Sequence, residues 1–162
     1  MSESARKRKE GEAVVAENRR ARSKYSFDES LEVGVVLTGS EVKAIRKHGL
    51  ELGDAYAQVE RGQLELLHAF VPMYSHASVY GHEPRRARRL LAHRAQIEKL
   101  DVRTHQRGFT LIPLRAYFKG GRLKIEIGVG KGKAAEDRRE EIKTRESDRE
   151  ARAALARRRD KS

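Results

Sequence analysis

Alternating hydrophobic and polar residues predict strands along the middle of the chain. Tyr25, Phe27 and Leu31 alternate with polar residues and lead into a valine-rich run, a pattern typical of one long strand. Gly34 inside this run predicts an irregularity near residues 32–34. Five further strand segments are predicted over residues 54–60, 63–70, 109–114, 115–118 and 123–129, with turns at Arg61-Gly62 and Gly120-Gly121.

Helical patterns interrupt these strands at two places. In residues 41–48, Val42 and Ile45 share one apolar face, Ser40 is the expected N-cap and Gly49 is the expected stop. A second helical region is predicted over residues 85–107, where arginines surround an apolar stripe made of Leu90, Leu91, Ile97 and Leu100.

These elements predict a mainly β fold with helices. A sheet of six strands avoids exposed edges best by closing on itself, so we expect a closed six-stranded antiparallel barrel of oligonucleotide-binding type. Composition changes at both ends of the chain. We expect a disordered basic N-terminus over residues 1–15, a β-barrel RNA-binding domain over residues 16–130, and a charged C-terminal tail over residues 131–162.

The tail has helical potential but few residues that bury a core. Glu141 and Arg145, like Asp148 and Arg152, are spaced four residues apart, as ion pairs on one helix face are. Large aliphatic side chains are scarce in this segment. We therefore expect the tail to be largely disordered when free and to become helical when bound to a partner.

Charge favours a polyanionic partner. The 162 residues carry 36 Lys and Arg against 24 Asp and Glu, a formal net charge of +12. Each cation that meets a phosphate releases condensed counterions, so nucleic acid is the first candidate and an anionic membrane the second. Basic clusters at residues 19–22 and 85–89 border the predicted strands, and arginine suits both phosphates and base stacking.

Signals for an enzyme, a metal site or a membrane protein are poor. The chain has no cysteine, its six histidines are scattered, and the GKGK run at residues 130–133 lacks the spacing of a phosphate-binding loop. No apolar stretch approaches the ~18 residues that span a bilayer, and the N-terminus lacks a signal-peptide pattern. We therefore predict a cytoplasmic, non-enzymatic protein with no metal or cofactor and no membrane contact.

Several ordered motifs resemble one known family, the SmpB or SsrA-binding proteins. The resemblance covers about residues 13–152 and is carried by residues 18–21 (NRRA), 32–46 (EVGVVLTGSEVKAIR), 88–91 (RRLL), 108–114 (GFTLIPL), 124–128 (KIEIG), 130–133 (GKGK) and 137–139 (DRR). Motifs in register along one chain are far more specific than any single match.

The resemblance implies a function in ribosome rescue. Members of the family bind the tRNA-like domain of transfer-messenger RNA and deliver it to stalled 70S ribosomes for trans-translation, with elongation factor Tu taking part indirectly. Their body replaces a missing anticodon arm, and their tail enters the vacant mRNA channel near the decoding centre. For this chain the resemblance therefore implies an RNA-binding body, a ribosome-binding tail and a monomer.

The resemblance also implies individual contacts. The expected RNA-facing residues are Asn18, Arg19, Glu32, Leu91 and Lys124, and the wider candidate set adds Arg20, Lys43, Arg46 and Arg89. For Glu32 and Leu91 structural roles stay open, as a carboxylate that stabilises a bulge and as a core leucine. The ribosome-binding tail set is Lys131, Gly132, Lys133, Asp137, Arg138 and Arg139.

The tail departs from the family pattern at Ala134 and Glu136, and Glu136 cannot stack on a base. Two other functions stay open at this stage, a general ribosomal or RNA-chaperone protein and an RNA-processing enzyme. The first would bind transfer-messenger RNA and bulk transfer RNA equally, whereas the second would leave a cleaved or modified product.

Overall fold

The computed structural model describes residues 12–74, 81–133 and 135–160. The chain divides into two compact units, which we call the body (residues up to Gly132) and the tail (Lys133–Ser162). In chain order the elements are β1 (Glu12–Glu17), α1 (Arg19–Lys24), β2 (Tyr25–Val35), α2 (Gly39–His48), β3 (Tyr56–Glu60), β4 (Gln63–Leu67), β5 (Arg88–Leu91), α3 (Arg94–His105), β6 (Phe109–Lys119), β7 (Arg122–Gly132) and α4 (Ala135–Asp160).

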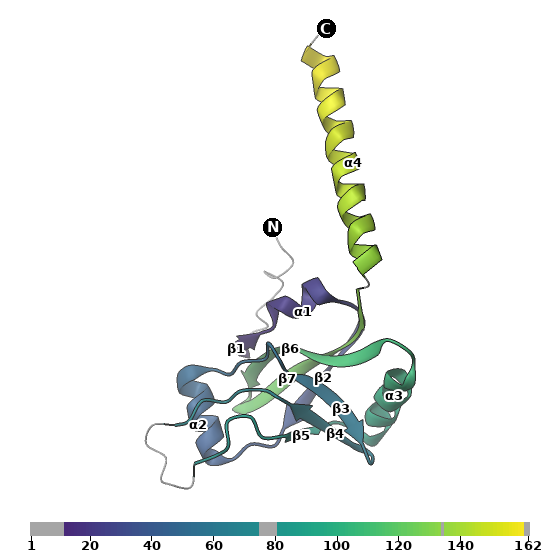
Figure 1. Cartoon of the computed structure of the whole chain (residues 1–162). Coiled ribbons are helices and arrows are strands. Elements are labelled where there is room, and N and C mark those ends of the chain that lie inside the picture. Colours follow the sequence, from purple (N-terminus) through teal and green to yellow (C-terminus); the bar gives the residue numbers. More distant parts are fainter. Residues whose placement is uncertain (1–11, 75–80, 134, 161–162) are drawn as a thin grey trace. The chain divides into compact units, whose positions relative to one another are not determined.

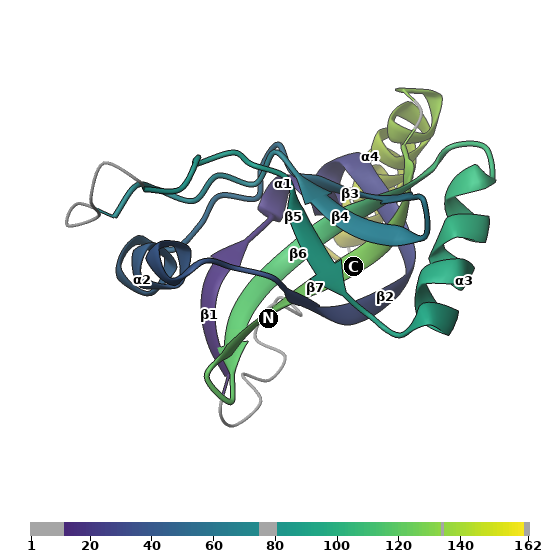
Figure 2. The ribbon, with the colours of Figure 1, turned by 90° about the horizontal axis from the view of Figure 1, so that it is seen from below.

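Within the described part of the chain, six strands of the body form a ring of hydrogen-bonded neighbours. Their order is β6-β3-β4-β5-β2-β7, and β7 pairs again with β6. Every pairing is antiparallel. β1 adds to the edge of β6 that β3 also uses, with β1 along residues 115–119 and β3 at Leu111 (Figures 1 and 2). The prediction of a mainly β fold with helices is therefore confirmed.

Alternation along the strands separates an inner from an outer face of the ring. In β7, Leu123, Ile125 and Ile127 are buried, whereas Lys124 and Glu126 between them are only half-buried. Figure 2 shows α2 and α3 on opposite sides of the ring. α2 buries Ala44 and Ile45 against the core, and α3 buries Leu100. The hydrophobic core thus fills the ring, and the outer face is left to other contacts.

The helix predicted over residues 85–107 is wrong in its first part. Residues Arg88–Leu91 form β5, in which Arg88 and Leu90 are buried while Arg89 and Leu91 are exposed, and α3 begins only at Arg94. Only Ile97 and Leu100 of the expected stripe therefore lie on the helix. The alternating pattern of a strand was not recognised in the sequence because Arg88, which faces the interior, is not a typical core residue.

Three strand predictions also need correction. β1 occupies Glu12–Glu17, so residues 12–15 are ordered rather than disordered, and residues 1–11 lie outside the described part. β6 is one strand over Phe109–Lys119 instead of two, with a register shift between Pro113 and Arg115. The irregularity in β2 falls between Phe27 and Glu29 and not at Gly34. The described residues form seven strands rather than the six predicted, and the ring itself contains six because β5 takes the place of the surplus segment while β1 lies outside it.

α2 begins two residues earlier than expected. Thr38 and not Ser40 is the N-cap: its hydroxyl accepts from the Glu41 backbone N–H, and the Glu41 carboxylate accepts from the Thr38 N–H at 2.9 Å. The predicted stop at Gly49 is confirmed, with φ of +73° in the left-handed region. Glu41 therefore has a structural role at the helix start.

Glu41 is also the centre of a buried ion cluster. Its carboxylate is fully buried and accepts from Arg86 and from Arg88, with closest distances of 2.5 Å each. Arg88 is 1% exposed, and its other four donors go to the backbone carbonyls of Ala69, Glu83, Pro84 and Arg86. All five N–H donors of the guanidinium are thereby used. The cluster joins α2 to β5 and to the segment before it.

The cluster makes stability sensitive to acid. Burial alone would raise the pKa of Glu41, but hydrogen bonds from Arg86, the Thr38 backbone and Arg88 outweigh it and hold the pKa at about 2. A carboxylate with a lowered folded-state pKa stabilises the protein above its unfolded pKa. That contribution is lost as pH falls from the ordinary value of 4.5 toward 2.

The tail contains one helix, α4, over Ala135–Asp160. The helical potential of the sequence is thus confirmed, but the expected coil in the free state is not seen over these residues. The 26-residue length exceeds the roughly 12–15 residues below which isolated helices are marginal in water. Among the described residues, no helix combines the length and the apolar character needed to cross a membrane.

Candidate nucleic-acid interface

A transverse row of residues crosses the outer face of four neighbouring strands. Gly34 of β2 pairs with Leu91 of β5 on one side and with Lys124 of β7 on the other. Lys124 in turn pairs with Tyr117 of β6. Directly opposed residues of antiparallel strands point to the same face of a sheet, so these four positions are neighbours. We call Leu91, Gly34, Lys124 and Tyr117 the outer row.

Leu91 is the exposed hydrophobic member of the outer row. Its side chain is 51% exposed, although the adjacent Leu90 is buried in the ring. A core role for Leu91 is therefore wrong. An exposed leucine beside a lysine can pack on the face of a nucleobase while the lysine meets the phosphate.

Glu32 lies on the same face, two residues along β2 from Gly34. The Tyr117 hydroxyl donates a short hydrogen bond to its carboxylate, and the Lys119 ammonium lies 3.6 Å from the other oxygen. The hydrogen bond from Tyr117 lowers the pKa of Glu32, and Lys119 and Lys124 lower it further against the effect of partial burial. Burial raises the pKa of Tyr117, so the phenol keeps its proton. The site thus presents an ionised, oriented carboxylate.

Arg115 supports this carboxylate from the neighbouring position of β6. Its guanidinium lies 4.5 Å from the Tyr117 ring centre and makes ion pairs with Glu126 at 2.7 Å and Glu12 at 3.3 Å. Sequence reasoning did not identify Tyr117 or Arg115 as site residues. No local pattern marks Tyr117, because it is 2% exposed and follows the buried Ala116, so its place in the outer row follows only from strand register.

Cations flank the outer row, and one of them, Lys119, is also the ion-pair partner of Glu32. Arg89 lies two residues before Leu91, and its carbonyl accepts from the backbone N–H of Val36 at 2.9 Å. Lys119 lies two residues after Tyr117 on β6, and Arg122 lies two residues before Lys124 on β7. These two residues pair with each other across the antiparallel strands. Arg89 and Arg122 are exposed. Glu32, Arg89, Leu91 and Lys124 of the candidate set therefore share one face.

Asn18 is not on a surface. It is 6% exposed, and its amide nitrogen donates to the carbonyls of Leu52 at 3.1 Å and Pro113 at 3.0 Å. Its side-chain oxygen accepts from the Ala21 N–H and caps α1. Asn18 therefore fixes the start of α1, and the side chains that α1 presents are Arg19 and Arg20, both exposed.

The two candidate RNA-binding residues of α2, Arg46 and Lys43, lie over different aromatic side chains. The Arg46 guanidinium is 4.7 Å from the centre of Phe118, which follows Tyr117 on β6 and therefore points to the opposite face of the strand from the outer row. The Lys43 ammonium is 6.0 Å from the ring centre of Tyr74. Both side chains are exposed.

The second basic cluster of the sequence is mostly structural. Arg86 and Arg88 bind the buried Glu41, and the Arg85 guanidinium lies 5.1 Å from the Phe70 ring centre. Only Arg89 of the five-residue run at 85–89 belongs to the face of the outer row. Of this basic cluster, only Arg89 was a candidate RNA-binding residue, and it is the one that lies on this face.

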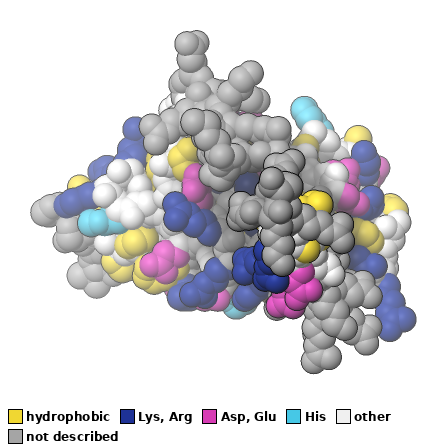
Figure 3. All heavy atoms as spheres, turned by 90° about the horizontal axis from the view of Figure 1, so that it is seen from above, with side chains coloured by type: hydrophobic (Ala, Val, Ile, Leu, Met, Phe, Trp, Pro, Cys, Tyr) yellow, Lys and Arg dark blue, Asp and Glu magenta, His cyan; other side chains and the backbone are white. Residues whose placement is uncertain are grey.

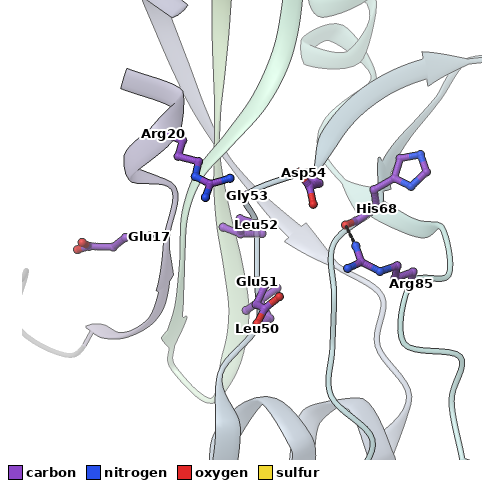
Figure 4. Close-up of a pocket in the computed structure, with 9 residues that line it drawn as sticks. All are labelled: Glu17, Arg20, Leu50, Glu51, Leu52, Gly53, Asp54, His68 and Arg85. Carbon is purple, nitrogen blue, oxygen red and sulfur yellow. Dashed lines mark hydrogen bonds between the residues drawn. The ribbon is translucent and has the colours of Figure 1, made fainter. Parts of the chain in front are cut away.

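A pocket of about 360 Å³ lies elsewhere on the body. Figure 4 shows Arg20 and Arg85 reaching it from opposite sides, with Asp54 and Glu51 between them. Glu17 also lines it. Three carboxylates against two guanidiniums do not favour an anion. Figure 3 shows a similar mixture, with basic side chains interspersed among acidic ones on the face in view, so charge alone does not mark the interface there.

The tail candidates fall at the junction and along α4. Lys131 and Gly132 end β7, and the Lys131 ammonium lies 6.0 Å from the ring centre of Phe109. Lys133 follows β7 as the first residue of the tail. Asp137, Arg138 and Arg139 are in the first turns of α4, and their side chains lie outside the described part, as does Ala134.

Comparisons with known proteins agree on one family. The family model described as SmpB protein matches residues 15–157. SsrA-binding proteins of Myxococcus xanthus and Thermobifida fusca are 47% and 44% identical, over 91% and 96% of this chain and 91% and 99% of their own. A solved structure described as "tmRNA-SmpB: a journey to the center of the bacterial ribosome" matches with a TM-score of 0.64 and 38% identity, over 76% of this chain and 87% of that one.

We predict that Tyr117→Phe raises the pKa of Glu32. The substitution keeps the ring under Arg115 but removes the hydroxyl that favours the charged carboxylate. Carbon-13 NMR titration of the Glu32 carboxyl measures the effect, with Tyr56→Phe on β3 as the matched control. An unchanged pKa in Tyr117→Phe would show that the hydrogen bond does not orient Glu32.

Proposed function

The chain belongs to the SmpB family of SsrA-binding proteins, and from this premise we propose that the outer row of the body holds transfer-messenger RNA during trans-translation. The protein binds transfer-messenger RNA and works with it on the stalled ribosome, in keeping with the similarity to SsrA-binding proteins and to a tmRNA–SmpB structure.

One observation supports the assignment of the interface above the others. Glu32, Leu91 and Lys124 come from β2, β5 and β7 and are separated by 33 to 92 residues in sequence, yet strand register makes them neighbours. Each was expected to face RNA before its position was known. Their convergence on one exposed face gives a charge, an apolar contact and an acceptor within one site.

Each of the three side chains has a distinct part in binding. Lys124 neutralises a phosphate, which contributes affinity but carries no sequence information. Leu91 packs on an unstacked base, and ionised Glu32 accepts a hydrogen bond from a base amine or a 2′-hydroxyl. Because Tyr117 already holds Glu32 in place, the carboxylate loses little freedom on binding.

The scaffold suits binding rather than catalysis. We interpret the ring as a closed barrel of oligonucleotide-binding type, whose strands hold the outer row rigid. The protein then acts as a non-enzymatic adaptor in the cytoplasm, where the stalled ribosome is. Arg19 and Arg20, set in place by Asn18, supply a second cationic point on the body.

The tail acts separately, in the vacant mRNA channel near the decoding centre. Residues 131–162, which are the last two residues of β7 followed by the tail, carry 12 positive and 8 negative charges. The described side chains of α4 are exposed, including Leu155, so within those residues the helix buries no face of its own. A helix of this kind is suited to fit against ribosomal RNA, with Lys131, Lys133, Arg138 and Arg139 nearest the body in sequence.

We predict that the wild-type protein prefers transfer-messenger RNA over bulk transfer RNA at physiological salt and that Lys124→Ala weakens this binding. Loss of one phosphate contact reduces the slope of log K against log salt by about 0.7–0.9. Competition binding over a salt series measures both effects, with the exposed Lys47→Ala as control. Equal affinity of the wild type for the two RNAs would favour a general RNA-binding protein instead.

We predict that truncation after Gly132 leaves the affinity for transfer-messenger RNA nearly unchanged but abolishes peptide tagging on stalled ribosomes. The outer row lies entirely in the body, whereas the truncation removes the whole tail. Binding and tagging assays on the full chain and the truncated body separate the two roles. A large loss of RNA affinity in the truncated body would contradict this division.

A further inference from the structure

Gly34 is the second-last residue of β2, at the position where this strand pairs with both β5 and β7. Glycine weakens a strand because it loses more backbone freedom on folding than other residues and offers no side chain to pack. Such a position calls for a reason, either a backbone conformation that only glycine adopts, a close contact inside the protein, or a close contact with something outside it.

The first two reasons do not apply to Gly34. Its φ lies outside the left-handed region. The three atoms nearest to a Cβ built on Gly34 all belong to Leu91, with Cβ at 3.4 Å, Cδ1 at 3.7 Å and the backbone oxygen at 3.9 Å, which are ordinary contacts. Alanine therefore fits this position within the chain.

Two glycines of β7 differ in this respect. A Cβ on Gly128 or Gly130 of β7 would come within 2.7 Å of the Phe27 ring, so the packing of β2 on β7 requires both glycines. These two are explained by the fold. The packing of the fold does not explain Gly34, which lies on β2 between β5 and β7.

The surroundings of Gly34 indicate what approaches it. The half-exposed Leu91 stands on one side and Lys124 on the other, with Glu32 two residues before along β2 and the exposed Val36 two residues after. Because Gly34 has no side chain, flat backbone is left between the apolar side chain of Leu91 and the cation of Lys124, and we call this backbone the floor. A planar, apolar face with an attached anion fits this floor.

We propose that Gly34 is the floor of a nucleobase site, on which one unpaired base of transfer-messenger RNA lies against Leu91 with its phosphate at Lys124. This inference rests on the proposed function and assigns the contact to backbone, which no side-chain pattern reveals. The exposed Arg89 and Arg122 on the same face favour RNA over a protein as the occupant.

The test is a graded series, Gly34→Ala and Gly34→Val, in the full chain. We expect thermal stability to hold or rise slightly in Gly34→Ala, because the Cβ fits and the unfolded chain loses freedom. Affinity for transfer-messenger RNA falls about tenfold, the loss expected when one stacked base is displaced, and falls further in Gly34→Val. The salt slope stays that of the wild type, because no phosphate contact is removed, in contrast to Lys124→Ala.

Gly39→Ala at the start of α2 is the matched control, since a Cβ there meets nothing within 4 Å, and its affinity should equal that of the wild type. Wild-type affinity in Gly34→Ala and Gly34→Val would overturn the inference, as would a marked loss of stability in Gly34→Ala. If the wild type itself showed no preference for transfer-messenger RNA, the proposed function would fail first, and the two failures are thereby distinguished.

Discussion

The fold of the body depends on one buried charge. Glu41 is fully enclosed, and it is stable there only because Arg86 and Arg88 supply its counter-charges and the Thr38 N–H a further hydrogen bond. Burying ions without partners costs several kcal/mol each, so removing either side of the pair should be far more disruptive than removing a surface ion pair. Because Arg88 belongs to β5 and Glu41 to α2, the pair fixes where β5 lies in the ring.

The position of β5 determines the binding face. Once Arg88 points inward, strand alternation turns Arg89 and Leu91 outward, and the pairing of β5 with β2 brings Leu91 beside Gly34. The β2–β7 and β6–β7 pairings then add Lys124 and Tyr117. The interface is thus a consequence of register, in which few side chains make contact and exposed backbone is part of the surface. The tail contributes a separate function through a separate helix.

Local signals were sufficient for much of this architecture but not for its long-range contacts. The turns at Arg61-Gly62 and Gly120-Gly121 and the stop at Gly49 follow from local backbone preference and are confirmed. β1 and β5 were missed because a strand edge over 95 residues away stabilises the first, and an ion pair with Glu41 stabilises the second. The family resemblance supplied Glu32, Leu91 and Lys124, yet it gave no hint that Asn18 is buried. Tyr117 and the role of Gly34 become visible only from register.

The most direct test of this account is the affinity of Glu41→Gln for transfer-messenger RNA, measured at low temperature with circular dichroism to follow the folded fraction. Loss of the charge should cost about 3–5 kcal/mol, less than or comparable to the ~5–15 kcal/mol that stabilise a typical domain. The account predicts that the folded variant binds RNA markedly more weakly, although Glu41 is fully buried and touches no RNA, because β5 no longer holds Leu91 and Arg89 in register. Wild-type affinity in the folded variant would contradict it.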